Sequence, residues 1–375
     1  RLKTLIQRLA ESTDWPIVIV NGQLSPIQQR NLENDLHSKV IDRTQLILEI
    51  FGERAKTHAG RLQVELAALS FQRGRLVRSW THLERQRGGG GFLGGPGERQ
   101  IELDRRMLLK RVVRIRSELR EVLRTRTLHR GNRTRGGVPT VVLVGYTNAG
   151  KSTLFNRLTG ADVLSKDMLF ATLDPTVRKL NLDSGRGVLF TDTVGFISKL
   201  PTELIEAFKS TLEEVLYADI LVHVHDASSP LLLQESEDVS RVLRDIGLDE
   251  SSYKTRTINI LNKIDKVKLN PRLSENLRDT FPNAVLVSAL KDKGISDLKI
   301  KIDQYLNKTE LLALITLAPH FGAARAWLFE NGVVEMSRFD DYGYEYIEVR
   351  ISRTNHSRFC ARWPNVRITF KTSEF

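Results

Sequence analysis

The segment that most constrains the fold is GYTNAGKS at 145–152, which separates a β-branched run from an amphipathic stretch. Val141 to Val144 predict a buried strand, and Phe155 to Leu158 predict the helix that follows. Glycines at both ends allow the loop to wrap with its amides facing an anion, and the helix N-terminus adds a favourable dipole. The segment therefore predicts a phosphate-binding loop within an α/β domain.

Every residue of this loop is a predicted nucleotide contact: Gly145, Tyr146, Thr147, Asn148, Ala149, Gly150, Lys151 and Ser152. Lys151 is expected to reach the β- and γ-phosphate oxygens, and the Ser152 hydroxyl is expected to bind Mg²⁺. Asn148 is a candidate ligand for a monovalent cation such as K⁺. Its alternative role is to tolerate an unusual backbone conformation within the loop.

The choice of base is predicted from a second motif that ends the strand at 257–261, consisting of Asn262, Lys263, Ile264 and Asp265. The carboxylate of Asp265 can accept from both the N1 and N2 hydrogens of guanine, and adenine offers neither donor in that geometry. The stem of Lys263 would lie over the base. After the next strand, at 284–287, backbone amides are expected to complete the pocket at Ser288, Ala289 and Leu290. Guanine nucleotides are therefore the predicted ligands.

Two further segments are predicted to respond to the γ-phosphate. The first lies at the end of the strand at 188–191 and contains Asp192, Thr193, Val194 and Gly195. Asp192 would hold Mg²⁺ through water, and the amide of Gly195 would meet the phosphate. The second contains Phe170, Ala171, Thr172, Leu173 and Asp174. Thr172 is the expected Mg²⁺ ligand, with Thr176 as the alternative. The candidate catalytic residues are those expected to contact the γ-phosphate or its Mg²⁺, namely Lys151, Thr172 and Gly195.

Hydrolysis is predicted to be slow in the isolated protein. Many GTPases have a glutamine after the glycine to orient the attacking water, but Phe196 and Ile197 follow here. Neither side chain can hydrogen-bond to water. A partner is therefore expected to complete the site.

The chain of 375 residues is long enough for two or three domains, and it contains no apolar run of the ~18 residues that a membrane helix requires. Residues 1–51 predict a small α/β domain, residues 52–135 a basic helical hairpin, and residues 139–307 an α/β domain with a mostly parallel sheet and helices on both faces. Residues 310–375 predict a third, small α/β domain. Because the chain begins with Arg1 instead of methionine, its N-terminal domain is expected to lack its start.

The charge is concentrated in residues 52–135, which hold 21 Lys/Arg against 8 Asp/Glu, whereas the whole chain has a net charge of +12. Such an excess favours contact with a polyanion, and nucleic acid is the expected one. Two apolar seams predict helices that pack together, and the glycine-rich segment 88–97 between them is predicted to be non-helical. A plain coiled coil with a linker is the alternative. The candidate RNA contacts are Phe92, Leu93, Arg99, Arg105, Arg106, Arg111, Arg114 and Arg120.

Several other residues are interpreted as structural. His223 and His225 alternate along an expected strand and are read as sheet residues rather than metal ligands, and Asp226 ends that strand. Cys360 is interpreted as a packed thiol. A single cysteine excludes an internal disulfide and is consistent with a reducing compartment such as the cytoplasm, with an organelle matrix as the alternative.

Together, the motifs GYTNAGKS, FATLDPT, DTVGF and NKID resemble those of the HflX family of translational GTPases. The resemblance extends to GGPGE at 94–98, to Asp104, Arg105 and Arg106, and to LSP at 24–26 and VIDR at 40–43. Arg99 departs from the threonine common in the family. The resemblance implies binding to the large ribosomal subunit near the peptidyl-transferase region, with the glycine-rich tip approaching ribosomal RNA, and some members split ribosomes.

Two alternatives belong to other functional classes. A GTP-dependent ribosome assembly factor or RNA chaperone would carry the same motifs. A nucleotide kinase is disfavoured, because the chain has no evident second basic substrate pocket.

We expect the protein to be a monomer.

Overall fold

The computed structural model describes residues 3, 4, 6, 8, 16–86, 96–135, 138–161, 170, 172–198, 201, 204–205, 212, 214–267, 277 and 279–370, and among these it omits the side chains of 77–86, 96–101, 126–135, 309, 353–354 and 370. The chain divides into two compact units. One contains residues 1–126 and 198–212, and the other contains residues 127–197 and 213–375.

The first unit begins with a small α/β arrangement of β1 (Ile17–Val20), α2 (Pro26–Leu36), β2 (Lys39–Asp42) and α3 (Arg43–Arg54). The two strands pair in parallel, as their connection through a helix requires. Ser25 forms a capping box with Gln28 at the start of α2, and Pro26 occupies the first turn, where no amide is needed. Asp42 caps α3 by accepting from the amide of Gln45 at 2.8 Å.

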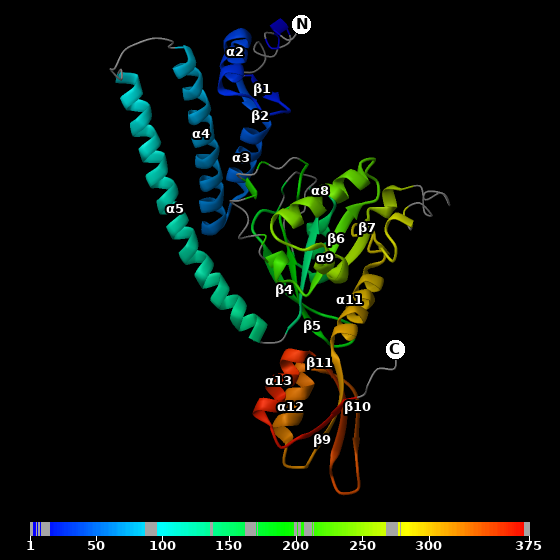
Figure 1. Cartoon of the computed structure of the whole chain (residues 1–375). Helices are drawn as coiled ribbons and strands as arrows, with labels where there is room; N and C mark the ends of the chain where they lie inside the picture. The colour runs from blue at the N-terminus through cyan, green and yellow to red at the C-terminus, as the bar shows by residue number, and fades with distance from the viewer. Residues whose placement is uncertain are drawn as a thin grey trace. The chain divides into compact units, whose positions relative to one another are not determined.

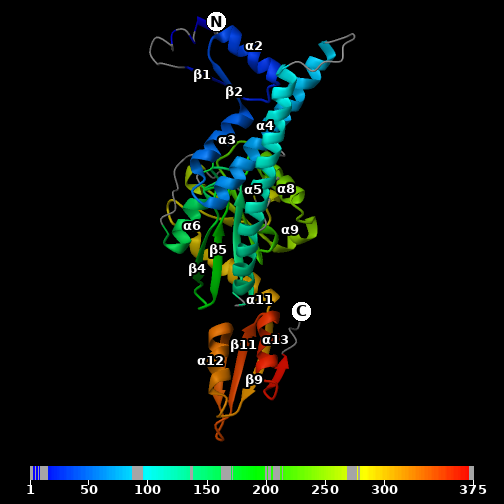
Figure 2. The ribbon, with the colours of Figure 1, turned by 90° about the vertical axis from the view of Figure 1, so that its left-hand side faces the viewer.

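Two long helices, α4 (His58–Gln86) and α5 (Pro96–Arg135), run side by side (Figures 1 and 2). The predicted apolar seam packs between them through a cluster of buried residues, namely Leu62, Leu66, Val112, Ile115 and Leu119. The non-helical prediction for 88–97 is wrong at Pro96 and Gly97, because proline fits the first helical turn. At its other end, α5 extends through the polar segment 132–135, up to the predicted end of the hairpin. No helix in the described part of the chain is long and apolar enough to span a membrane.

The second unit contains a six-stranded sheet in the order β4-β5-β3-β6-β7-β8. Its strands are β3 (Thr140–Gly145), β4 (Thr176–Asn181), β5 (Gly187–Asp192), β6 (Ile220–Asp226), β7 (Thr257–Asn262) and β8 (Val285–Leu286). All pairings are parallel except that of β4 with β5, which are joined by a short turn. The carboxyl ends of the parallel strands therefore meet at one edge, where α/β proteins place their ligands.

Helices pack on this sheet, as Figure 1 shows. They are α6 (Lys151–Thr159), α8 (Leu232–Asp245), α9 (Glu250–Arg256) and α11 (Ile295–Thr309). A short 3₁₀ turn, η1 (Ile264–Lys266), follows β7. Leu154 and Phe155 of α6 and Leu298 of α11 join the buried strand residues in one apolar core. The predicted fold class, a phosphate-loop domain with a mostly parallel sheet and additional domains at both ends, is confirmed.

The C-terminal part is a second, separate sheet with two helices. Its elements are β9 (Leu311–Leu317), α12 (Gly322–Asn331), β10 (Val333–Phe339), β11 (Glu345–Ile351), α13 (Arg353–Arg362) and β12 (Arg367–Phe370). The strand order is β10-β11-β9-β12, entirely antiparallel. Strand β12 was not predicted, because its four residues after Pro364 are too short to establish an alternation. The β-α-β-β-α-β succession is a recurrent supersecondary arrangement.

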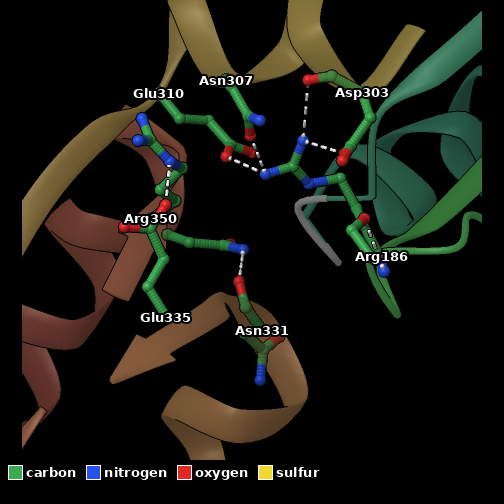
Figure 3. A network of polar contacts seen from close by, with 9 residues as sticks. Arg186, Asp303, Asn307, Glu310, Asn331, Glu335 and Arg350 are labelled. Atoms are coloured by element: carbon green, nitrogen blue, oxygen red, sulfur yellow. Dashed lines mark hydrogen bonds and ion pairs between the residues drawn. The ribbon is translucent and has the colours of Figure 1, made fainter. Parts of the chain in front are cut away.

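The two sheets of this unit are linked by a polar network around Arg186, which lies in the turn between β4 and β5 (Figure 3). Its guanidinium donates to Asp303 Oδ1 at 2.8 Å, to Asn307 Oδ1 at 2.9 Å and to Glu310 Oε2 at 2.5 Å. Arg186 is buried, so the cation needs these acceptors. Glu310 directly precedes β9, and the network thus attaches the β4–β5 turn to the start of the C-terminal sheet.

Candidate functional site

The phosphate loop connects the end of β3 to the start of α6, and its two terminal glycines are required by close approaches. Gly145 has φ of 151°, and a Cβ there would lie 2.3 Å from the carbonyl oxygen of Val224. Gly150 has φ of 92°, and a Cβ there would lie 2.3 Å from Nδ2 of Asn262. No side chain larger than hydrogen fits at either position. The loop is therefore packed against both the neighbouring strand β6 and the NKID segment.

Lys151 is the first residue of α6, and its ammonium group lies within the loop. Nζ donates to the carbonyl oxygens of Gly145 at 3.0 Å and Tyr146 at 2.9 Å. Burial lowers the pKa of Lys151 to about 8, and the nearby Asp192 carboxylate partly opposes this shift. An anion bound in the loop would restore the cation's preference for its charged form.

Three oxygen atoms from distant parts of the chain meet beside the loop. The hydroxyls of Ser152 and Thr172 lie 2.8 Å apart, and they donate to Asp192 Oδ2 at 2.7 and 2.9 Å. The structure thus brings together the loop, the 170–174 segment and the end of β5. Of the two threonines considered, Thr172 is the one that reaches Ser152, and Thr176 begins β4 instead.

The chemistry of this oxygen cluster fits a hard divalent cation. Asp192 is fully buried, and its Oδ1 has no hydrogen-bond partner among the described residues. Burial raises the pKa of the Asp192 carboxyl, while Lys151 and the hydroxyls of Ser152 and Thr172 oppose that rise. A buried carboxylate oxygen without a partner, next to two hydroxyls, is the donor set that Mg²⁺ uses in phosphate-binding sites.

The DTVG segment runs alongside the phosphate loop. The amide of Thr147 donates to the carbonyl of Phe196 at 2.7 Å, and the amide of Phe196 donates to the carbonyl of Gly145 at 3.1 Å. A Cβ on Gly195 would lie 2.9 Å from Cα of Thr147, so only glycine allows this approach. The ring of Phe196 is buried and does not present a polar group to water.

Asn262 connects the phosphate loop to the 288–290 segment. Its Nδ2 donates to the carbonyl of Ala149 at 2.9 Å, and its Oδ1 accepts from the amide of Ala289 at 3.1 Å. The Ser288 hydroxyl donates to Asp265 Oδ1 at 2.5 Å. This hydrogen bond lowers the pKa of Asp265, which keeps the carboxylate ionised and available as an acceptor.

The partner of Lys263 is Asp226, a residue for which the sequence alone favours a structural role. The backbone of Lys263 is left-handed, with φ of 63°, and its Nζ lies 2.7 Å from Asp226 Oδ2. Asp226 pairs with Asn262 in the register of β6 and β7, so the two strands end at the same edge of the sheet. In the sequence, the feature that could have indicated this pairing is Asp226 itself, an acidic residue at the end of the strand that precedes the NKID strand.

The other predicted nucleotide contacts occupy varied positions. Thr193 donates from Oγ1 to the carbonyl of Leu143 at 2.6 Å, and Val194 is buried. Asn148 has φ of 61° and an exposed side chain. The remaining predicted positions around the site are buried at Phe170 and Leu173, partly buried at Asp174 and Ile264, and exposed at Leu290. Ala171 lies outside the described residues.

The candidate RNA contacts whose side chains the structure describes lie on α5, where Arg105, Arg106, Arg111, Arg114 and Arg120 are all exposed. Arg111 pairs with Glu65 of α4 at 2.7 Å, and Arg114 pairs with Glu118 at 2.9 Å. Arg106 lies 3.8 Å from Glu102, so part of the positive charge is balanced locally. Phe92 and Leu93 lie outside the described residues, as does the side chain of Arg99.

The two histidines of β6 are buried against α9 and β7. His223 Nδ1 lies 2.7 Å from the hydroxyl of Tyr253, and His225 Nε2 lies 3.1 Å from Asn259 Oδ1. Their rings lie 3.9 Å apart. Burial lowers the pKa of both, to about 4 for His225. Cys360 is half-buried, and its Sγ lies 3.3 Å from Nε2 of His356.

Three family models match successive parts of the chain. A model described as GTP-binding GTPase N-terminal matches residues 2–52, and one described as GTP-binding GTPase Middle Region matches residues 54–133. A third, described as 50S ribosome-binding GTPase, matches residues 140–263. A solved structure of a GTP-binding protein from Sulfolobus solfataricus in complex with GDP has 26% sequence identity and a TM-score of 0.45, covering 80% of this chain and 84% of that one.

Two relatives match over nearly the whole of this chain. GTPase HflX of Magnetococcus marinus is 47% identical over 348 residues, which cover 92% of this chain and 78% of the relative. GTPase HflX of Escherichia coli is 43% identical over 361 residues, covering 96% and 83%. The resemblance seen in the sequence motifs is therefore confirmed. The chain belongs to the GTPase HflX family, and it hydrolyses GTP.

Proposed function

We propose that the GTP-bound chain binds the large ribosomal subunit and couples GTP hydrolysis to ribosome splitting and recycling or to rescue. The observation that carries this proposal is the meeting of Ser152, Thr172 and Asp192, because it joins two segments expected to respond to the γ-phosphate. A family model described as 50S ribosome-binding GTPase supports the choice of partner. The cytoplasm is the proposed site of action.

In this proposal Ser152 and Thr172 hold Mg²⁺ directly, and Asp192 holds it through water. Bound there, the ion would neutralise charge on the β- and γ-phosphate oxygens. Lys151 would turn from the loop carbonyls towards the phosphate, and the Gly195 amide would donate to the γ-phosphate. Loss of the γ-phosphate would remove a contact that holds the 170–174 segment beside Ser152. The bound nucleotide would thereby control the position of this segment.

Base selection in this proposal rests on Asp265, whose carboxylate is already held by Ser288 at 2.5 Å. Asn262 hydrogen-bonds to both the phosphate loop and Ala289, and so connects the phosphate subsite to the base subsite. Asn148 is the proposed ligand of a monovalent cation. Replacing Na⁺ with K⁺ should then raise turnover, and equal rates in the two salts would reduce Asn148 to a backbone role.

The hairpin is the proposed contact with ribosomal RNA. Its charge should make binding to the large subunit fall steeply as salt rises, because each phosphate contact releases counterions. Reversing the charge of Arg105 and Arg120 should flatten that slope by about one unit per lost contact. Arg111 is less suitable, since it also pairs with Glu65 of α4. GTP affinity should be unchanged when Arg105 and Arg120 are reversed.

The tip is tested separately by deleting residues 89–95. We expect this deletion to retain charge-driven binding to the large subunit and to lose the functional output, because Phe92 and Leu93 are proposed to contact unpaired bases. A deleted protein with full activity on ribosomes would reduce the glycine-rich segment to a linker.

Sedimentation distinguishes the proposed role from assembly. Intact ribosomes are mixed with the protein and a non-hydrolysable GTP analogue, and the gradient is read for free subunits. Release of subunits supports splitting. Retention of the protein only on immature large particles supports a GTP-dependent assembly factor or RNA chaperone. Lys151→Ala is the control, because without its loop cation the variant should not bind GTP tightly.

A further inference from the structure

The C-terminal sheet has one face that no described helix covers. Ala324 and Leu328 of α12 and Phe359 of α13 pack with Ile315 of β9 and Ile347 of β11 in a single core. Figure 2 shows both helices on the same side of the sheet. Because side chains alternate along a strand, the residues between these core positions project from the opposite face.

A row of four residues crosses that open face from one edge strand to the other. The register pairs Arg338 of β10 with Tyr346 of β11, Tyr346 with Thr316 of β9, and Thr316 with Arg367 of β12. Tyr346 is 40% exposed, and both arginines are exposed. Three strand spacings separate the arginines, about 14 Å. An aromatic ring on a central strand thus lies between two cations on the two edge strands.

The position of Tyr346 is supported by the hairpin that precedes β11. Its hydroxyl donates to Asp340 Oδ2 at 3.3 Å. Asp340 Oδ1 also accepts from the amides of Tyr342 and Tyr344, at 3.0 and 2.8 Å, and so holds the turn. Gly343, with φ of 81°, allows this turn to form. The ring is therefore restrained before any ligand arrives, which reduces the entropic cost of binding.

Arg338 and Arg367 make the two ends of the row positive, and the Asp340 carboxylate lies at the Tyr346 hydroxyl, where the turn amides also donate to it. Glu335 is paired with Arg350, and Glu348, in the adjacent row, is buried. Met336, 42% exposed, extends the apolar surface beside Tyr346. An aromatic and apolar strip bordered by guanidinium groups is complementary to a ligand with flat bases and a phosphate backbone.

We propose that this face binds single-stranded RNA, with an unpaired base stacked on Tyr346 and neighbouring phosphates bound by Arg338 and Arg367. In a duplex the bases stack on one another, so their faces are not available to a tyrosine on a flat sheet. The proposal goes beyond the function proposed above, which assigns RNA contacts to the helical hairpin.

The test uses the full chain and a short, uniformly pyrimidine RNA labelled with a fluorophore and one 4-thiouridine. Ultraviolet crosslinking followed by peptide mapping should place a crosslink in the β11 peptide that contains Tyr346. In fluorescence anisotropy, Tyr346→Ala should weaken binding about ten-fold, since stacking on one aromatic side chain has roughly that value. Tyr346→Phe keeps the ring but loses the hydrogen bond to Asp340, so its loss of affinity should be clearly smaller than that of Tyr346→Ala.

Tyr342→Ala is the matched control. Tyr342 is 86% exposed in the same hairpin and lies in the turn instead of on the sheet face, so its loss should not change affinity. A double reversal, Arg338→Glu with Arg367→Glu, should reduce the salt dependence of binding by about 1.4 units, since each phosphate contact with a single strand contributes about 0.7. An unlabelled duplex of the same length should compete poorly for the crosslink at β11.

Two results would overturn the proposal: crosslinks confined to residues 96–135, or equal affinities of the Tyr346→Ala and Tyr342→Ala variants for the RNA. Because the assay needs neither ribosomes nor GTP, failure of the proposed ribosomal function would leave its outcome unaffected.

Discussion

Lys263 and Asp226 form an ion pair of 2.7 Å between the ends of two neighbouring parallel strands. The two side chains are only 15% and 17% exposed, so water screens the pair weakly. The left-handed backbone of Lys263 turns its side chain back over the sheet edge, where Asp226 holds the ammonium group. The pair therefore fixes the side chain that is proposed to lie over the base.

Asp226→Asn should weaken the binding of GTP and GDP by about ten-fold, because it removes a charge-assisted hydrogen bond of roughly 1.5 kcal/mol or more. The loss should be the same for inosine nucleotides, since Lys263 lies over the ring and does not read its edge. Titration with a fluorescent GDP analogue measures it. Asp183→Asn, at an exposed carboxylate 4.0 Å from Lys299, is the control. Unchanged affinity in Asp226→Asn would make the ion pair incidental.

Asp265→Asn should weaken GTP binding and shift preference towards xanthine nucleotides. The amide cannot accept from both guanine hydrogens, whereas it can donate to the second carbonyl of xanthine. Competition between GTP, XTP and ATP for a fluorescent nucleotide measures the preference. If the discrimination between GTP and ATP persisted in the variant, another residue would have to read the base.

Arg186→Met should destabilise the chain by about 3–5 kcal/mol, the usual effect of removing one partner from a buried ion pair. Asp303 and Glu310 would be left without their cation. Burial already raises the pKa of Glu310 in the presence of Arg186, so the uncompensated carboxylate is costly. Urea unfolding of the second unit measures the change, and Glu310→Gln in the same variant should restore part of it. An exposed arginine of β4, Arg178, gives the control Arg178→Met, expected within about 0.5 kcal/mol of the parent.

Stability should fall as the pH decreases from about 6.5 towards 4. The pKa of His225 is lowered from 6.5 to about 4 by burial, so the folded state holds the ring neutral where the unfolded state already binds a proton. The stabilisation from His225 is fully present above pH 6.5. Between pH 6.5 and 4 it decreases by about 1.4 kcal/mol per pH unit. Urea midpoints at pH 7.5 and 5 measure the slope.

The controls for this pH dependence are two substitutions. His225→Gln should reduce the slope between pH 6.5 and 4 and leave the contribution of His223, whose pKa is also lowered by burial. His320→Gln, at an exposed position, should leave it unchanged. An equal slope in the parent and in His225→Gln would assign the acid sensitivity to other groups.

The sequence predicted those parts of the fold that local patterns specify. The phosphate loop, the NKID segment and the apolar seam of the hairpin depend on residue types at fixed spacing, and the structure brings the loop, Thr172, Asp192 and Asn262 together. Pairs between distant positions were not accessible in the same way. Arg186 and Glu310 are 124 residues apart, and no local pattern relates them.

Other differences also have physical reasons. Proline and glycine at 96–97 predict a non-helical segment, yet both are tolerated in the first turn of α5. The short edge strand β12 is defined by its pairing with β9 and has too few residues to show a period. Asp226 was interpreted as structural because a single carboxylate at a strand end carries no signal until its partner is known.

GTP turnover with and without purified large ribosomal subunits is the measurement that tests the central claim most directly. The account predicts slow hydrolysis by the chain alone, because Phe196 offers no group to orient water, and a clear increase when large subunits are added. Small subunits should have no such effect. Fast turnover that large subunits leave unchanged would contradict the account, since the chain would then contain a complete catalytic site of its own.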